Sequence, residues 1–445
     1  MWTDSLGNPV TVEGEAGVGA LNDFAEGFIA SEARAANVLE AALRDDSPMV
    51  QAYAAAVHLF AETRNAAANS RPFLARALAG QGRCTPRERR FIEAIDAWAG
   101  SDIPRAIALH EQQAREYPRD LASLKLGHYH LFNTGNSPGM LRLALACLPA
   151  AGDVPYLHGM LAFAWEQCHL LEQAEAAARR AIDMCRKEPW AHHALAHVML
   201  TQGRVQEGHA FLEEVSPTWI GLNSFMVTHN WWHQALFALE MARHDEVLAL
   251  YDERVWGVAK DYSQDQINAV SLLARLELAG VDVGERWQDL GGYLAARVQD
   301  QVLPFLDMQY LYGLARAGRA EAGSLMRNIE QHADLALGHR AAAWQQVCVP
   351  ASRGLMAHAQ GDFERAVNEL GLALPRLLEI GGSHAQRDLF AQVHLDSLVR
   401  TGRLAAAQHL LQQQIRSQPQ SQRLKRQAAP VYAALGLEPV ACGVL

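Results

Sequence analysis

Apolar residues recur every three or four positions along most of the chain, from Ala20 towards the C-terminus, as in LALACL (143–148) and QAEAAARRAIDM (173–184). This spacing places apolar side chains along one face of a helix. The strict alternation of apolar and polar residues that marks a strand is almost absent. The pattern therefore predicts an all-α fold.

A repeat of 34 residues is visible in this helical pattern. Small or apolar residues occur at Ala106, Met140, Ala174 and Gly208, each 34 positions after the one before. A glycine that ends the preceding helix recurs in GRVQEG at 203, GRAEAG at 318, GDFERA at 361 and GRLAAA at 402, each with a small residue five positions later. One helix pair cannot bury both of its apolar faces, so pairs stack, and small side chains are needed where helices approach most closely. The spacing predicts a curved, tetratricopeptide-like helical repeat solenoid with an irregular middle section.

Helix starts and repeat spacing divide the chain into four expected parts. Thr85 and Glu88, and likewise Ser383 and Gln386, have the spacing of reciprocal caps at helix N-termini. We expect an N-terminal helical region continuous with the solenoid over residues 1–90, regular repeats over 91–251, an irregular helical insertion over 252–310 and C-terminal repeats over 311–445.

Several stretches of the chain resemble the tetratricopeptide repeat protein 38 family: AHHALAHVMLTQGRVQEG, THNWWHQALFALEMARHDEVLALYD, GVDVGERWQDL and GGSHAQRDLF. The likeness extends from about residue 20 to about residue 430. It implies a helical repeat fold, and it implies no particular reaction, cofactor or substrate. One departure is Gln309 in FLDMQYL, where relatives resemble FxDxH, so this chain has no imidazole at that position.

Composition excludes some functions. The formal net charge of -10 argues against binding nucleic acid or an anionic membrane surface. The one basic cluster, QRLKRQ at 422–427, fits a solvated helix face. No stretch approaches the roughly 20 apolar residues of a membrane span, and the first residues lack a basic start followed by an apolar run. We therefore expect a soluble, cytoplasmic protein; the sequence does not fix its oligomeric state.

Histidines gather in one part of the chain: eleven of the nineteen lie between residues 128 and 244. Most of them fall on first helices of the expected repeats, which stack side by side, so residues far apart in sequence can converge on one concave groove. We predict that this groove holds a small molecule or a peptide segment. The candidate ligand-binding residues are His128, Glu166, His193, His197, His229, Asn230, Trp232, His233, Asp307, Arg387 and Asp388.

Two further hypotheses use the same groove. In an enzyme, His229 or His233 would act as a general base or metal ligand, Asp307 would orient it or complete a metal site, and Arg387 would hold an anionic substrate group. A metal, if bound, would be held by His229, His233 and His197, because histidines four residues apart share a helix face. Asn230 stands where a zinc hydrolase of the HExxH type has its glutamate, so a metal is not favoured and no cofactor is expected.

Each candidate also has a purely structural interpretation. The imidazoles could be hydrogen-bonded between packed helices by Glu166, Asn230 or backbone carbonyls. Trp231 and Trp232 lie about 100 degrees apart around their helix, so one of them should be in the core. Arg387 and Asp388 could form a structural ion pair or a cap, and Asp307 could cap a helix.

Overall fold

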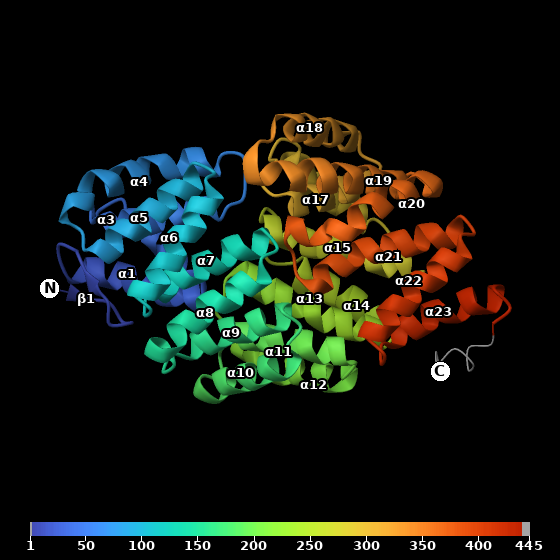
Figure 1. Cartoon of the computed structure of the whole chain (residues 1–445), viewed down its shortest axis with the longest axis horizontal. Coiled ribbons are helices and arrows are strands. Elements are labelled where there is room, and N and C mark those ends of the chain that lie inside the picture. The colour runs from blue at the N-terminus through green and yellow to red at the C-terminus, as the bar shows by residue number, and fades with distance from the viewer. Residues whose placement is uncertain (1, 438–445) are drawn as a thin grey trace. The chain divides into compact units, whose positions relative to one another are not determined.

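The computed structural model describes residues 2–437, so residues 438–445 of the predicted C-terminal range lie outside the described part (Figure 1). The chain divides into two compact units. The first comprises the chain up to Leu195 together with Pro217–Met226, and the second comprises Ala196–Ser216 together with the chain from Val227 onward.

The first unit begins with a small antiparallel pair of strands and continues in helices. Its elements are β1 (Trp2–Thr3), β2 (Pro9–Val10), α1 (Glu15–Ile29), η1 (Ala33–Asn37), α2 (Val38–Ala41), α3 (Pro48–Leu59), α4 (Ala66–Gly80), η2 (Gln81–Arg83), α5 (Pro86–Ala99), α6 (Ile103–Glu116), α7 (Leu121–Asn133), α8 (Ser137–Ala151), α9 (Pro155–Gln167) and α10 (Leu171–Met184). Three elements pass from one unit to the other along the chain: α11 (Pro189–Gln202), η3 (Ser216–Thr218) and α13 (Ser224–Glu240).

The second unit is helical throughout its described residues and includes two short π-helices, η4 and η7. Its elements are α12 (Val205–Val215), α14 (His244–Leu250), η4 (Tyr251–Val255), α15 (Ser263–Leu278), α16 (Arg286–Leu294), η5 (Ala295–Arg297), α17 (Pro304–Arg316), α18 (Glu321–Leu335), η6 (Gly338–Arg340), η7 (Ala343–Cys348), α19 (Val349–Ala359), α20 (Phe363–Ala373), η8 (Leu374–Ile380), α21 (His384–Arg400), α22 (Leu404–Ser417) and α23 (Gln422–Ala434).

Consecutive helices pack as pairs, and the pairs pack on one another. In the first unit α5 packs on α6, α7 on α8 and α9 on α10, while α6 also packs on α7 and α8 on α9. The same order of contacts runs through α19, α20, α21, α22 and α23 in the second unit. The predicted tetratricopeptide-like helical repeat is confirmed. The division into four sequence ranges stays a prediction.

The small residues of the 34-residue spacing lie where helices approach most closely. Ala106 and Ala174 are fully buried on the second helices of their pairs. Gly208 of α12 faces α13, and a Cβ atom built on it would stand 2.2 Å from Cζ of Phe237. No larger side chain fits there without displacing the Phe237 ring.

The predicted caps and turns are also present. Thr85 forms a reciprocal capping box with Glu88 at the start of α5, and Ser383 forms one with Gln386 at the start of α21. Gly203, the first of the recurrent turn glycines, has a φ of 72°. Its counterparts at positions 318, 361 and 402 have φ values between 63° and 80°. Glycine suits these turns because it adopts left-handed backbone without steric strain.

In the second unit the first helices of the pairs close on one another. α15 packs on α17, α17 on α19 and α19 on α21, and α21 returns to pack on α15. The rings of Phe305 and Phe390 meet edge to face at a centroid distance of 6.1 Å, joining α17 to α21.

The helices of the described residues are all too short or too polar to cross a membrane.

Candidate functional site

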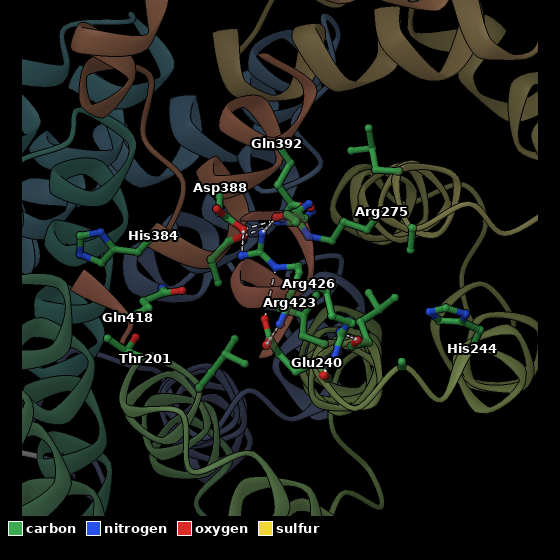
Figure 2. Close-up of a pocket in the computed structure, with 18 of the residues that line it drawn as sticks. Thr201, Glu240, His244, Arg275, His384, Asp388, Gln392, Gln418, Arg423 and Arg426 are labelled. Carbon is green, nitrogen blue, oxygen red and sulfur yellow. Dashed lines mark hydrogen bonds and ion pairs between the residues drawn. The ribbon is translucent and has the colours of Figure 1, made fainter. Parts of the chain in front are cut away.

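The second unit contains a cavity of about 330 Å³, lined by α11, α13, α15, α21 and α23 (Figure 2). That volume matches the lower end of the range found for small-molecule sites. Its charged and histidine lining residues are His197, Glu240, His244, Arg275, His384, Asp388, Arg423 and Arg426. Three arginines and two carboxylates therefore dominate the chemistry of its wall.

Arg275 of α15 is a buried cation, with only 5% of its surface exposed. Its guanidinium donates to the hydroxyl of Ser271 and to the carbonyl oxygen of Ala385, at 2.6 Å for the latter, and both partners are neutral. Burial lowers the pKa of Arg275 to about 10, which leaves it charged at neutral pH. A buried charge with neutral partners is costly unless an opposite charge approaches it.

Arg423 of α23 joins two carboxylates across the cavity. Its guanidinium donates to Glu240 at 3.2 Å and to Asp388 at 3.1 Å, and Figure 2 shows it between them. Its side chain is only 18% exposed. The predicted solvated face for QRLKRQ is therefore wrong for Arg423, because this side of α23 turns towards α13 and α21.

Arg426, one turn further along α23, binds the end of α13. It donates to the carbonyl oxygens of Leu239 and Glu240 at 3.2 and 3.0 Å. These are the last carbonyls of α13, which have no partner within their own helix. Ser421 adds a bond from its hydroxyl to Glu240 at 3.0 Å. α23 thus attaches to a helix that ends about 180 residues earlier in the chain.

Behind the cavity wall lies a cluster of buried histidines. His197 comes from α11, and His229 and His233 come from consecutive turns of α13. One ring nitrogen of each lies within 4.8 Å of those of the other two. The His197 and His233 rings are tilted at a centroid distance of 4.5 Å, and those of His229 and His233 meet edge to face at 4.9 Å. The predicted metal set is therefore brought together in space.

A hydrogen-bond chain orients His229. Thr228 donates to Asp265 at 2.9 Å, and the amide nitrogen of Asn268 lies 3.5 Å from the Thr228 hydroxyl oxygen. This arrangement turns the Asn268 carbonyl oxygen towards Nδ1 of His229, at 3.0 Å. Nδ1 therefore carries the proton. Burial lowers the pKa of His229 to about 3, so its ring is neutral at neutral pH.

Two contacts connect the histidine cluster to the cavity. The first is made by His197, which lines the cavity and is also a member of the histidine cluster. Arg275 lies over the ring of Trp232 at 5.5 Å, and that ring is stacked on His229 at an interplanar angle of 9°. Trp232 is fully buried, whereas Trp231 is partly exposed and lies against Arg254. The prediction that one of the two tryptophans is in the core is confirmed.

Three further predicted residues of the second unit are Asp307, Arg387 and Asp388. Asp307 lies in the first turn of α17, where it accepts a bond from Gln301 at 3.1 Å, and it is not a member of the histidine cluster. The capping residue of α17 is Leu303, so Asp307 does not cap that helix. Arg387 donates to the carbonyl oxygens of Gly381 and Gly382, and Asp388 pairs with Arg423.

Asn230 is fully buried, and its side-chain oxygen and nitrogen have no hydrogen-bond partner among residues 2–437. It follows His229 directly on α13 and precedes His233 by three positions, so it lies on the same side of the helix as His233. The prediction that its amide satisfies a neighbouring imidazole is therefore wrong for the described residues.

The remaining predicted residues belong to the first unit and make packing contacts there. Nε2 of His128 lies 2.8 Å from the carbonyl oxygen of Met140, which joins α7 to α8. Glu166 is buried and accepts a bond from Gln167 at 2.5 Å. His193 packs against Phe163 and Trp190. It stands one turn before His197 on α11 and so presents a further imidazole on the same helix face.

The residue pattern did not predict Arg275, Arg423, Arg426 or Glu240 as site residues. A lone Arg275 in the apolar helix SQDQINAVSLLARLEL gives a weak signal. The pair Arg423 and Arg426 gives a stronger one, since a spacing of three places both side chains on one face of a helix whose other face is apolar.

Comparison with known proteins adds little to this picture. No family model matches the chain. Among solved structures it is similar to a human IFIT1 dimer with PPP-AAAA (12% identity, TM-score 0.42, 89% of this chain and 93% of that chain). It is also similar to the Cut9–Hcn1 hetero-tetramer of APC/C (11%, TM-score 0.36, 95% and 84%) and to the P58(IPK) TPR domain (9%, TM-score 0.23, 71% and 99%). Similarity at this level carries no argument about function.

Proposed function

We propose that the protein binds a small anionic molecule, through a carboxylate or phosphate group, in the arginine-lined cavity of its second unit. The observation that carries this proposal is Arg275, a buried cation in the cavity wall whose hydrogen-bond partners are neutral. Arg423 already has Asp388 and Glu240 as counter-charges. The charge of Asp388 also acts on Arg275, but the two are not hydrogen-bonded. An anion beside Arg275 would supply a directly bonded counter-charge, and a guanidinium presents a fork of donors that suits carboxylate and phosphate oxygens.

A small molecule is favoured over a long peptide because of the size of the cavity. About 330 Å³ accommodates a compact metabolite or the end of a chain, rather than an extended segment. A peptide that enters only by its C-terminal carboxylate would use the same chemistry. Binding without reaction is favoured over catalysis, because Asp307, the proposed partner of a histidine base, is hydrogen-bonded to Gln301 instead.

The test compares Arg275→Met with a matched control, Arg254→Met. Both changes remove one guanidinium from the second unit, and Arg254 is exposed. Native mass spectrometry of the freshly purified chain identifies any co-purified ligand by mass. Thermal unfolding with succinate or inorganic phosphate as probe then measures binding, because a ligand that binds only the folded state raises the melting temperature.

We expect the wild-type chain and Arg254→Met to be stabilised by at least one of these anions, and Arg275→Met to bind it at least tenfold more weakly. Methionine is close to arginine in length and tolerant of irregular surroundings, so the variant should fold. The proposal fails if the wild-type chain carries no ligand and responds to neither anion at millimolar concentration, or if Arg275→Met responds equally.

A further inference from the structure

We propose that His197, His229 and His233 form a binding site for a divalent transition metal of the zinc class, beside the arginine-lined cavity. Two consecutive turns of α13 supply two of the ligands, and α11 supplies the third. All three residues are buried, and their nearest ring nitrogens already lie within 4.8 Å of one another.

The donor set determines the class of metal. Three imidazole nitrogens without a carboxylate suit zinc and its neighbours in the first transition series, whereas Mg²⁺ and Ca²⁺ require oxygen ligands. In a tetrahedral site with metal–nitrogen bonds of about 2.0–2.1 Å, the nitrogens stand about 3.4 Å apart. The present separations of up to 4.8 Å therefore close by rotation of the rings and small shifts of their side chains.

The surroundings of His229 match those of a metal ligand. In most protein metal sites a ligating histidine donates its second ring N–H to a carbonyl or carboxylate oxygen, which fixes the orientation of the ring. Asn268 takes that place on Nδ1, and Thr228 and Asp265 hold Asn268 in turn. Nε2 of His229 is then the atom that would ligate the metal.

The cavity lies beside these histidines. Three neutral imidazoles leave the full charge of the ion in place. His197 lines the cavity as well as the cluster, so an anion held there by Arg275 can reach the ion. This step rests on the proposed function, whereas metal binding itself requires only the histidines.

The experiment titrates the metal-free full-length chain with Co²⁺ and follows visible absorption, with Zn²⁺ used afterwards to displace it. We expect one equivalent of Co²⁺ with the spectrum of four-coordinate nitrogen ligation, and displacement by Zn²⁺. His229→Gln and His233→Gln should lose at least a hundredfold in affinity. Asn268→Leu should lose ten- to a hundredfold, since it leaves every ligand in place and removes only the partner of Nδ1.

His358→Gln is the matched control. It also removes a buried histidine of the second unit, one that is bonded to Tyr312 and Asp396, and it should bind metal like the wild-type chain. The proposal is overturned if the wild-type chain takes up no stoichiometric metal, or if the glutamine variants bind it unchanged. If those variants do not fold, the wild-type spectrum and Asn268→Leu decide the question. Arg275→Met should keep its metal, which separates this proposal from the preceding one.

Discussion

At the scale of the residue, burial sets the ionisation of the polar groups in the second unit. Asp307 is fully buried on α17, with Gln301 as its hydrogen-bond donor. Loss of hydration raises the pKa of its carboxyl group to about 8, from about 3.9 in an unfolded chain. Between about pH 4 and about pH 8, the folded protein therefore keeps a proton on Asp307 that the unfolded chain has released.

Stability should for this reason fall as the pH rises from about 4 to about 8. The contribution of Asp307 is most favourable below its unfolded pKa and is lost progressively up to its folded one, at a rate of up to about 1.4 kcal/mol per pH unit. In Asp307→Asn this dependence is absent. Urea denaturation of both proteins between about pH 5 and about pH 8 measures it. A constant difference in the free energy of unfolding across that range would contradict the prediction.

Residue identity alone predicted part of the candidate site. His229 and His233 share a face because they are four positions apart on one helix. His197 meets them because the repeat brings its part of α11 next to α13. Arg275 was missed because its importance depends on what surrounds it: neutral partners, the Trp232 ring and a cavity. None of these is visible in the spacing of residues.

At the scale of the element, local signals agreed with the fold. The capping boxes at Thr85 and Ser383 and the turn glycines with positive φ were predicted correctly, because such features depend on a few consecutive residues. The small positions of the repeat follow from packing between neighbouring helices. Gly208 and Gly323 occupy the same position in GRVQEG and GRAEAG, but their surroundings differ.

This difference gives a paired prediction. Gly208→Ala should lower the free energy of unfolding by about 1–3 kcal/mol, because the new methyl group collides with the Phe237 ring. Gly323→Ala should be neutral or raise it by up to about 1 kcal/mol, since the nearest atom is the flexible end of Arg327 at 3.7 Å and alanine favours the helix. Chemical denaturation of the two variants distinguishes them. Equal effects would show that α12 and α13 are less closely packed than described.

At the scale of the whole molecule, the cavity depends on a long-range closure that the repeat did not predict. Stacking explains why neighbouring pairs touch, but α23 also binds the end of α13 through Arg426 and Ser421. Such contacts depend on the rotation between successive helix pairs. Small differences in packing change each rotation, and these changes accumulate along the chain. The local sequence of α23 shows only an amphipathic helix with a basic face.

Removal of α23 should therefore abolish anion binding without unfolding the protein. A chain that ends at Ser417 lacks Arg423 and Arg426, so Glu240 and Asp388 lose their guanidinium partner and repel an anion from the cavity. The apolar residues of α22 that pack on Leu424 and Val431 become exposed, which should lower the melting temperature by several degrees. A chain that ends at Leu437 is the control, since it keeps α23. Calorimetric titration with succinate and phosphate, together with circular dichroism, compares the two. If the shorter chain bound either anion as tightly as the control, the arginines of α23 would have no part in recognition and Arg275 alone would carry it.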